Sequence, residues 1–390
     1  MSRSGASARA AAMLVAALSL SIATAAMVAR GQMATADRIK DPGWWPTKGT
    51  AARSEYAGTA ACRDCHPRES ASQPSTSMAR TAARADRSDV LRASPRLTFD
   101  NAGYAYAIAS DGPQPLYGVT QNERSSSAPL TWAFGDGKVG QSYLFERNGA
   151  FYEARVSYYQ SVHGLGFTPG RALAAPRSID EAMGRRLDDT ELRRCFACHT
   201  TAPIAAGKFD ASTAVPGITC EGCHGPGRRH AEVMKQPRHV AGDAPMLNPA
   251  NLTAEESLDF CGACHGSFFD VVLAGETGIA AMRSQPYRLR TSRCWTKADA
   301  RLACIACHEP HRPLEKGADA YDDRCRSCHV SAGAQPSAEH PGRACPVGTA
   351  GCPACHMPKF EVPDMKHRFT DHRIRVVERA AKRPEGQGRP

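Results

Sequence analysis

Alternating apolar and polar positions predict β-strands in one region of the chain. The stretch LTFDNAGYAYAIA, residues 97–109, alternates on both sides of an Asn-Ala-Gly turn. The stretch QSYLFERNGAFYEARVSYY, residues 141–159, places Asn148-Gly149 between two such runs. Asn-Gly between alternating segments is the strongest short-range hairpin signal. We therefore predict strands from about residue 92 to residue 160, inside a β-rich module that covers 86–177.

Two further segments have patterns of their own on the C-terminal side of this module. Ser178 and Glu181 have the spacing of a capping box, which predicts the start of a helical section that leads into the motif at Cys195. The stretch 376–390 is polar and basic and contains proline and glycine, so we predict a disordered tail there.

The N-terminal 36 residues predict export. An uncharged run over 10–29 follows Arg3 and Arg9, as in a secretory signal, and Ala23-Thr24-Ala25 offers a small-residue cleavage site. The run is also long enough to span a bilayer, so an uncleaved anchor is the alternative. We assign 1–36 to a signal peptide or N-terminal anchor. In both cases the rest of the chain lies outside the cytoplasm.

Cysteine spacing indicates the chemistry. Of the sixteen cysteines, fourteen lie in seven Cys-x-x-Cys-His motifs, far more than random placement would give. Cysteines three residues apart lie on one side of a helical turn, so each can form a thioether with one vinyl group of the same porphyrin. The next histidine then reaches the haem iron. The motifs are Cys62/Cys65/His66, Cys195/Cys198/His199, Cys220/Cys223/His224, Cys261/Cys264/His265, Cys304/Cys307/His308, Cys325/Cys328/His329 and Cys352/Cys355/His356.

These motifs predict seven covalently bound c-type haems. Zinc sites and redox-active thiol pairs are the alternatives, but neither requires a histidine after every cysteine pair. Cys294 and Cys345 remain outside the motifs. They are either a disulfide, which an oxidising compartment would allow, or two separate thiols.

The distribution of motifs predicts the architecture. The first lies in the segment 43–85. The other six lie in a domain over 178–375, between Cys195 and His356, at about 27 residues per motif. This is too little polypeptide to enclose each haem in an ordinary apolar core. The haems therefore have to supply much of the core themselves. We expect a mainly α fold with long loops, organised around stacked haems. The β-rich module is then a small insert after the first motif.

The formal charge of +10 does not indicate nucleic acid. Seven haems add fourteen propionates, about −14, and the ferric irons add about +7, so the oxidised protein is close to about +3. The basic residues are better explained as partners of propionates.

Each haem iron has a second axial position, whose ligand sets the behaviour of the haem. His230 follows His224 by only six residues and His311 follows His308 by three, which is too short to reach the far face of the same haem. Each should therefore serve a neighbouring haem. The candidate distal ligands are His230, His311, His372, His163 and Met78, with His239, His340 and His367 less favoured. The alternative for each histidine is a solvated side chain, and for Met78 it is packing against a haem edge.

Four phrases around these motifs carry a resemblance to a known family. They are CHGPGRRH (223–230), CHEPH (307–311), CPACHMPK (352–359) and TDHRIR (370–375). With the seven motifs they resemble multihaem c-type cytochromes, and the chain is similar to the tetrahaem electron-carrier family of ammonia-oxidising bacteria and its larger relatives in anaerobic respiration. The resemblance covers about 56–80 and 190–376. It implies haems that stack in pairs and pass electrons along their chain.

Three functions are consistent with this sequence. We favour the first, an electron carrier between redox partners in a bacterium. Its expected location is the periplasm or another place outside the cytoplasm. A membrane quinol-oxidising complex is one candidate partner. The second function is an oxidoreductase that acts on a small nitrogen or sulfur compound at one five-coordinate haem. The lysine-ligated motif Cys-x-x-Cys-Lys of one multihaem nitrite reductase family is absent, and we assign no catalytic residue. The third is a structural subunit that docks a membrane complex through the β-rich module.

Overall fold

The computed structural model describes residues 51–170, 175–205, 208–238, 246–276, 278–296, 301–317, 319–330, 334–338 and 342–376. The expected N-terminal signal or anchor and the tail beyond residue 376 lie outside the described residues. The chain divides into two compact units, which we describe separately. Unit 1 comprises residues 1–252 and 310–313, and unit 2 comprises residues 253–309 and 314–390.

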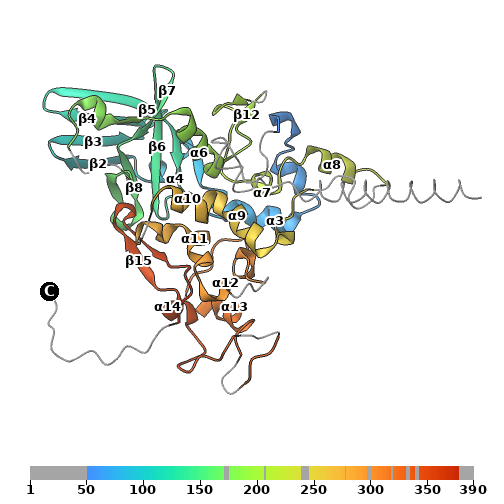
Figure 1. Cartoon of the computed structure of the whole chain (residues 1–390). Coiled ribbons are helices and arrows are strands. Elements are labelled where there is room, and N and C mark those ends of the chain that lie inside the picture. Colours follow the sequence, from blue (N-terminus) through green and yellow to red (C-terminus); the bar gives the residue numbers. More distant parts are fainter. Residues whose placement is uncertain are drawn as a thin grey trace, which may run out of the picture. The chain divides into compact units, whose positions relative to one another are not determined.

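A ten-stranded sheet dominates unit 1 (Figure 1). Its main path runs β10-β7-β6-β5-β4-β3-β2, with β1 beside β5 and with β8 and β9 extending from β6. The strands are β1 (Ala82–Arg84), β2 (Arg96–Asn101), β3 (Tyr104–Ala109), β4 (Leu116–Gln121), β5 (Arg124–Phe134), β6 (Gly140–Arg147), β7 (Ala150–Ala154), β8 (Val156–Tyr159), β9 (Gly164–Phe167) and β10 (Gly184–Arg186).

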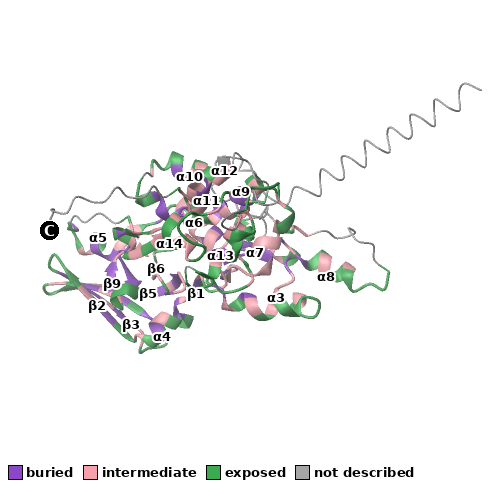
Figure 2. Cartoon of the chain, turned by 90° about the horizontal axis from the view of Figure 1, so that it is seen from below, coloured by how far each residue is buried: buried purple, intermediate pink, exposed green. Residues whose placement is uncertain are grey.

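The prediction of a mainly α fold is therefore wrong. The physical reason is that antiparallel strands joined by short hairpins pair with their neighbours and bury one face, so the module forms a hydrophobic core of its own. Tyr106, Tyr117, Leu130, Tyr143 and Phe145 are almost fully buried in this core. Figure 2 shows the buried residues along β5 and β6 in purple.

The hairpin at Asn148-Gly149 is confirmed. It joins β6 to β7 with Arg147 opposite Ala150. Asn148 has a φ of 51° and Gly149 a φ of 73°, and a two-residue turn that matches the strand twist requires two such left-handed residues. The Ala102-Gly103 turn between β2 and β3 has the same property, with φ values of 50° and 80°.

The helical section predicted from Ser178 into the second motif is interrupted by a strand. Ser178 Oγ does accept from Glu181 N, but α5 (Ile179–Met183) ends after five residues because the chain enters β10, which pairs with β7. A second helix, α6 (Asp189–His199), then starts at a complete capping box formed by Asp188 and Glu191.

The other elements of unit 1 are short. They are α3 (Pro67–Ser72), α4 (Asp89–Ala93), α7 (Cys220–His224), α8 (Arg228–Met234), and the two-residue strands β11 (Thr200–Thr201), β12 (Ile204–Ala205), β13 (Lys208–Phe209) and β14 (Val215–Pro216). Helix α6 packs on the sheet, because the Phe196 ring lies 4.9 Å from the Trp132 ring and 5.3 Å from the Phe134 ring.

Unit 2 consists of short helices, long loops and one hairpin. Its helices are α9 (Ala254–His265), α10 (Phe268–Leu273), α11 (Gln285–Arg290), α12 (Arg293–Thr296), α13 (Asp322–Arg326) and α14 (Cys352–His356), and its hairpin pairs β15 (Lys359–Val362) with β16 (His367–Thr370). Leu258 and Phe260 of α9 and Leu289 of α11 are among its buried apolar residues. None of the helices among the described residues of either unit has the length and apolar character needed to cross a membrane.

Candidate haem-binding sites

The attachment cysteines lie mostly on helical turns. Cys195 and Cys198 lie on α6, Cys261 and Cys264 end α9, and α7 and α14 each contain a complete motif. Cys304 starts the 3₁₀-helix Cys304–Ala306, with Cys307 directly after it, and Cys62 ends the 3₁₀-helix Thr59–Cys62. Cysteines three residues apart on one helix face the same side of their turn, as two thioether bonds to one porphyrin require.

Cys65 and Cys328 lie in turns just after the helical elements that contain the first cysteines of their motifs. Cys65 is exposed in the turn after the 3₁₀-helix Thr59–Cys62, and Cys328 is partly buried in the turn after α13. Pro67 disfavours helical backbone at the residue before it, and Cys328 O accepts instead from Gly342 N at 2.9 Å. In both motifs the backbone N–H of the histidine donates to the backbone carbonyl of the first cysteine at 2.9 Å, from His66 to Cys62 and from His329 to Cys325. One helix-like turn therefore spans each motif.

Motifs that are distant in sequence meet in pairs at their first cysteines. Burial raises the pKa of Cys62 to about 11, and the neighbouring Cys220 thiol adds to this shift. A hydrogen bond with Cys261 is the main reason that the pKa of Cys304 is lowered. Burial raises the pKa of Cys325, while a hydrogen bond with Cys352 opposes the shift. The attachment residues of motifs one and three, four and five, and six and seven thus lie together.

The second motif lies against the sheet of unit 1. Burial raises the pKa of Cys195 to about 12, with a smaller contribution from Glu153 of β7. The His199 ring stacks on Phe134 of β5 at a centroid distance of 5.0 Å. The strand-rich module is therefore part of the surroundings of this motif.

Two pairs of histidine rings face one another. The His224 and His311 rings have centroids 6.0 Å apart and planes only 6° from parallel, and both lie in unit 1. In unit 2 the His308 and His372 rings have centroids 6.1 Å apart and planes at 36°. Because a metal–imidazole bond is about 2 Å long, two imidazoles that bind one metal from opposite sides have centroids about 6 Å apart. The centroid distances of both pairs match this value.

Backbone carbonyls orient the rings of five candidate ligands. Because a carbonyl oxygen only accepts, each Nδ1 carries the proton, and Nε2 keeps a lone pair for a metal. The Nδ1–O distances are 2.9 Å for His199 and Thr81, 2.8 Å for His224 and Leu247, 3.0 Å for His329 and Arg343, 2.7 Å for His356 and Arg375, and 3.0 Å for His372 and Thr370.

The remaining motif histidines have different surroundings. His66 is exposed at the start of α3. His265 ends α9, and burial followed by the charge of nearby His308 lowers its pKa. Burial also lowers the pKa of His372, to about 4, which favours the neutral imidazole that binds a metal.

The other candidate distal ligands lie on different elements and differ in their exposure. His163 is exposed in a left-handed conformation with φ 46°, and its Nδ1 lies 3.2 Å from the side-chain nitrogen of Gln160. His230 is partly buried on α8, and Met78 is partly buried in the turns after α3. His367 lies on β16 against Phe369. His239 and His340 lie outside the described residues.

The described residues bear on two of the alternatives for the cysteines, a zinc site and a disulfide. These residues contain no group of three or more His, Cys, Asp or Glu side chains that could hold a metal ion, so the four-ligand zinc site is not formed among them. Cys294 and Cys345 do not form a disulfide.

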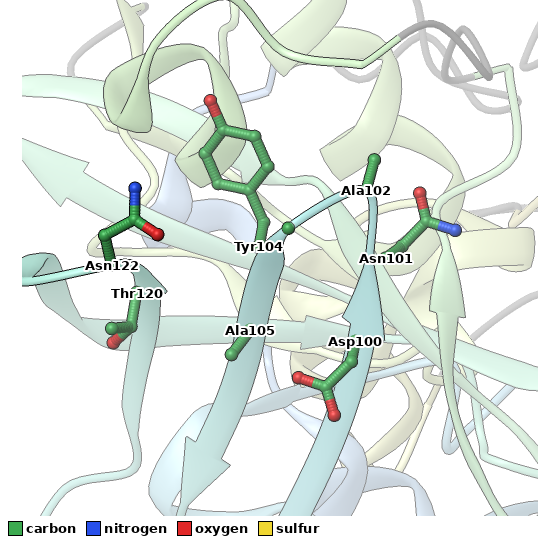
Figure 3. A pocket seen from close by; sticks show the side chains of 8 residues that line it. Asp100, Asn101, Ala102, Tyr104, Ala105, Thr120 and Asn122 are labelled. Atoms are coloured by element: carbon green, nitrogen blue, oxygen red, sulfur yellow. The ribbon is translucent and has the colours of Figure 1, made fainter.

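A shallow pocket of about 440 Å³ lies at the turn end of the β2–β3 hairpin (Figure 3). Asp100, Asn101, Tyr104, Thr120 and Asn122 are among the residues that line it. Its lining contains no cysteine, histidine or methionine, and we assign no haem to it.

Three buried acidic residues next to the motifs were missed in the sequence. Asp371, just before His372, is fully buried and binds Arg288 through two hydrogen bonds of 2.8 and 2.9 Å. Arg375 also contacts Asp371, and its carbonyl orients His356. Asp371 thereby holds a segment that serves two candidate sites. Of the other two residues, Glu221 lies inside the third motif, and Asp322 lies three residues before Cys325. That position was the only signal the sequence offered.

Gly217 allows the chain between the second and third motifs to approach the turn after α3. Its φ is 78°, and an added Cβ would lie 1.9 Å from the carbonyl oxygen of Ala79. We expect Gly217→Ala to lower the free energy of unfolding by more than the roughly 1–3 kcal/mol typical of backbone strain alone, as measured by denaturant titration. Gly149→Ala is the control, because its φ of 73° is similar but nothing lies within 4 Å of the added Cβ. Equal losses in the two variants would contradict the close approach.

Comparison with known proteins supports the chemistry of these sites. The family model described as cytochrome c554 and c-prime matches residues 171–225, which include two complete motifs, Cys195–His199 and Cys220–His224. The solved structure of the outer cell wall cytochrome OcwA matches 83% of this chain and 80% of its own at 15% identity, with a TM-score of 0.38. No curated protein matches the chain. The family match and the repeated motif support a multihaem c-type cytochrome and a haem-based electron carrier.

Proposed function

We propose that this protein is a seven-haem c-type cytochrome that carries electrons between redox partners and catalyses no reaction of its own on a small substrate. A c-type haem supplies an iron that gains and loses one electron. The observation that carries the proposal is the pair of facing imidazoles, His224 with His311 and His308 with His372, at centroid distances of 6.0 and 6.1 Å.

Facing imidazoles favour a carrier over an enzyme. His224 and His311 would hold one iron from opposite sides, which would leave no position free for another ligand. The same holds for His308 and His372. A substrate has no free position at such an iron, whereas electron transfer needs none. Two histidines also leave the coordination the same in both oxidation states, so little reorganisation accompanies a change of charge.

The five other motifs are proposed to bind haem through the same residue types. Their iron ligands on the motif side are His66, His199, His265, His329 and His356. His230 and Met78 are the candidates for the opposite side, with His239, His340 and His367 less favoured, whereas His163 is exposed beside Gln160. The thioether bonds would come from the fourteen motif cysteines, Cys65 and Cys328 included, and the first cysteines already adjoin in three pairs, which supports haems that lie near one another.

We propose an extracytoplasmic location and protein redox partners. The uncharged run over 10–29 behind two arginines supports export. In bacteria, c-type haem is attached to proteins after export, which agrees with an extracytoplasmic location. A membrane quinol-oxidising complex is a candidate electron donor.

Haem stoichiometry tests this proposal. The pyridine haemochrome assay, combined with the intact mass, is expected to give seven haems per chain, and a stepwise reductive titration is expected to take up seven electrons. A variant in which Cys352 and Cys355 are both replaced by Ala is the matched control, and it should retain six haems. A count well below seven in the unaltered protein would contradict the proposal.

A further inference from the structure

We infer that two buried carboxylates, those of Glu221 and Asp322, are positioning residues, and that each sets the relative placement of two haem-attachment motifs. This inference rests on the proposed function. In the described part of the chain the buried acidic residues are Glu221 at 2% exposure, Asp322 at 2% and Asp371 at 0%. A buried carboxylate costs free energy unless hydrogen bonds compensate it, so its partners show what its burial achieves.

Glu221 joins the third motif to the first. It lies between Cys220 and Cys223, and its carboxylate accepts three backbone N–H bonds. Oε1 accepts from Ala57 at 2.7 Å and from Gly227 at 2.8 Å, and Oε2 accepts from Gly58 at 2.9 Å. Gly58 is the residue immediately before the 3₁₀-helix that ends at Cys62. The side chain therefore fixes the start of the first motif against the third.

Asp322 joins the sixth motif to the seventh in the same way. It is the first residue of α13, three residues before Cys325. Its Oδ2 accepts from Gly351 N at 2.6 Å and its Oδ1 from Cys352 N at 2.8 Å. Burial opposes ionisation, but these backbone bonds outweigh it and lower the pKa of Asp322. The carboxylate thus holds the start of α14, which carries the seventh motif.

A separate observation points to the same motif pairs. The side chain of Cys62 lies close to that of Cys220, and the side chain of Cys325 lies close to that of Cys352. The fourth and fifth motifs also meet, at Cys261 and Cys304, but there the Cys304 thiol lies 3.9 Å from a backbone carbonyl, that of Ser257. The two carboxylates therefore coincide with two of the three motif contacts, and each would lie beside the two haems that those motifs hold.

The decisive variant is Asp322→Asn, with Asp323→Asn as its control. Asp323 is the exposed neighbour, and its carboxylate contacts Arg326. An amide offers only one acceptor atom, so one of the two backbone bonds is lost, and the second N–H then faces an NH₂ group. We expect the amides of Gly351 and Cys352 to exchange hydrogen about 10- to 100-fold faster. Two haem reduction potentials should rise together, because a negative charge that favours the ferric state has been removed.

Glu221→Gln, with the exposed Glu232→Gln as control, tests the other pair independently, including the case in which Asp322→Asn fails to fold. Exchange at Ala57, Gly58 or Gly227 should become faster, and two potentials should rise. Unchanged exchange and unchanged potentials with seven haems attached would overturn this inference and leave the proposed function intact. Fewer than seven haems in the unaltered protein would instead overturn the proposed function.

Discussion

The His311→Ala variant is expected to show one high-spin ferric haem while all seven haems stay covalently attached. The His311 ring faces His224 at a centroid distance of 6.0 Å with nearly parallel planes. Removing it takes away one axial ligand, and a ferric haem left with a single histidine becomes five-coordinate or binds water, which gives a high-spin iron. Attachment through Cys220 and Cys223 does not involve His311. Electron paramagnetic resonance of the oxidised variant measures the spin state, and the pyridine haemochrome assay measures attachment.

His163→Ala is the matched control for this prediction. His163 was also a candidate distal ligand, but it is exposed in a left-handed turn, with the Gln160 side-chain nitrogen 3.2 Å from its Nδ1. The spectrum of this variant should equal that of the unaltered protein. Seven low-spin haems in His311→Ala would show that His311 is a loop histidine without an iron.

The Asp371→Ala variant is expected to lose about 3–5 kcal/mol of unfolding free energy, as is typical when one partner of a buried ion pair is removed. Asp371 is fully buried, and Arg288, which binds it with two hydrogen bonds, is itself only 12% exposed. Burial raises the pKa of Asp371, but the bonds from Arg288 and Arg373 outweigh it and lower the pKa overall. Without the carboxylate, the Arg288 guanidinium stays buried without its counterion.

Denaturant titration measures this loss, and Glu361→Gln is the control. Glu361 lies on β15 of the same unit and is exposed, so the change should cost less than about 0.5 kcal/mol. The Asp371→Ala variant should also disturb the His308 site, because the segment that presents His372 is held by Asp371. A loss comparable to that of Glu361→Gln would contradict the structural role assigned to this ion pair.

The hairpins and the haem motifs could be predicted from the sequence because both depend on local spacing. Asn148-Gly149 specifies its turn through two left-handed residues, and Cys-x-x-Cys-His carries its chemistry within five positions. The extent of the sheet could not be predicted in this way. Strands β1 and β10 are three residues long and too short to alternate visibly, and they exist because β5 and β7 offer them a pairing edge. The break between α5 and α6 has the same cause.

The candidate site was predictable in part for a similar reason. The spacing of only three residues between His308 and His311 predicted that His311 serves a haem other than that of His308. Only the fold shows that the His311 ring lies next to the His224 ring. The buried carboxylates could not have been found from residue type, because aspartate and glutamate are usually exposed. Asp322 and Asp323 are adjacent in sequence, yet only Asp322 is buried, since only its side chain reaches the backbone of α14.

The most direct test of the account is the electron paramagnetic resonance spectrum of the oxidised, fully loaded protein. We predict only low-spin ferric signals, which together account for the seven haems measured chemically, and no change on addition of nitrite, hydroxylamine or sulfite. A high-spin ferric signal that shifts when one of these compounds is added would contradict the electron carrier and indicate an oxidoreductase with an open iron.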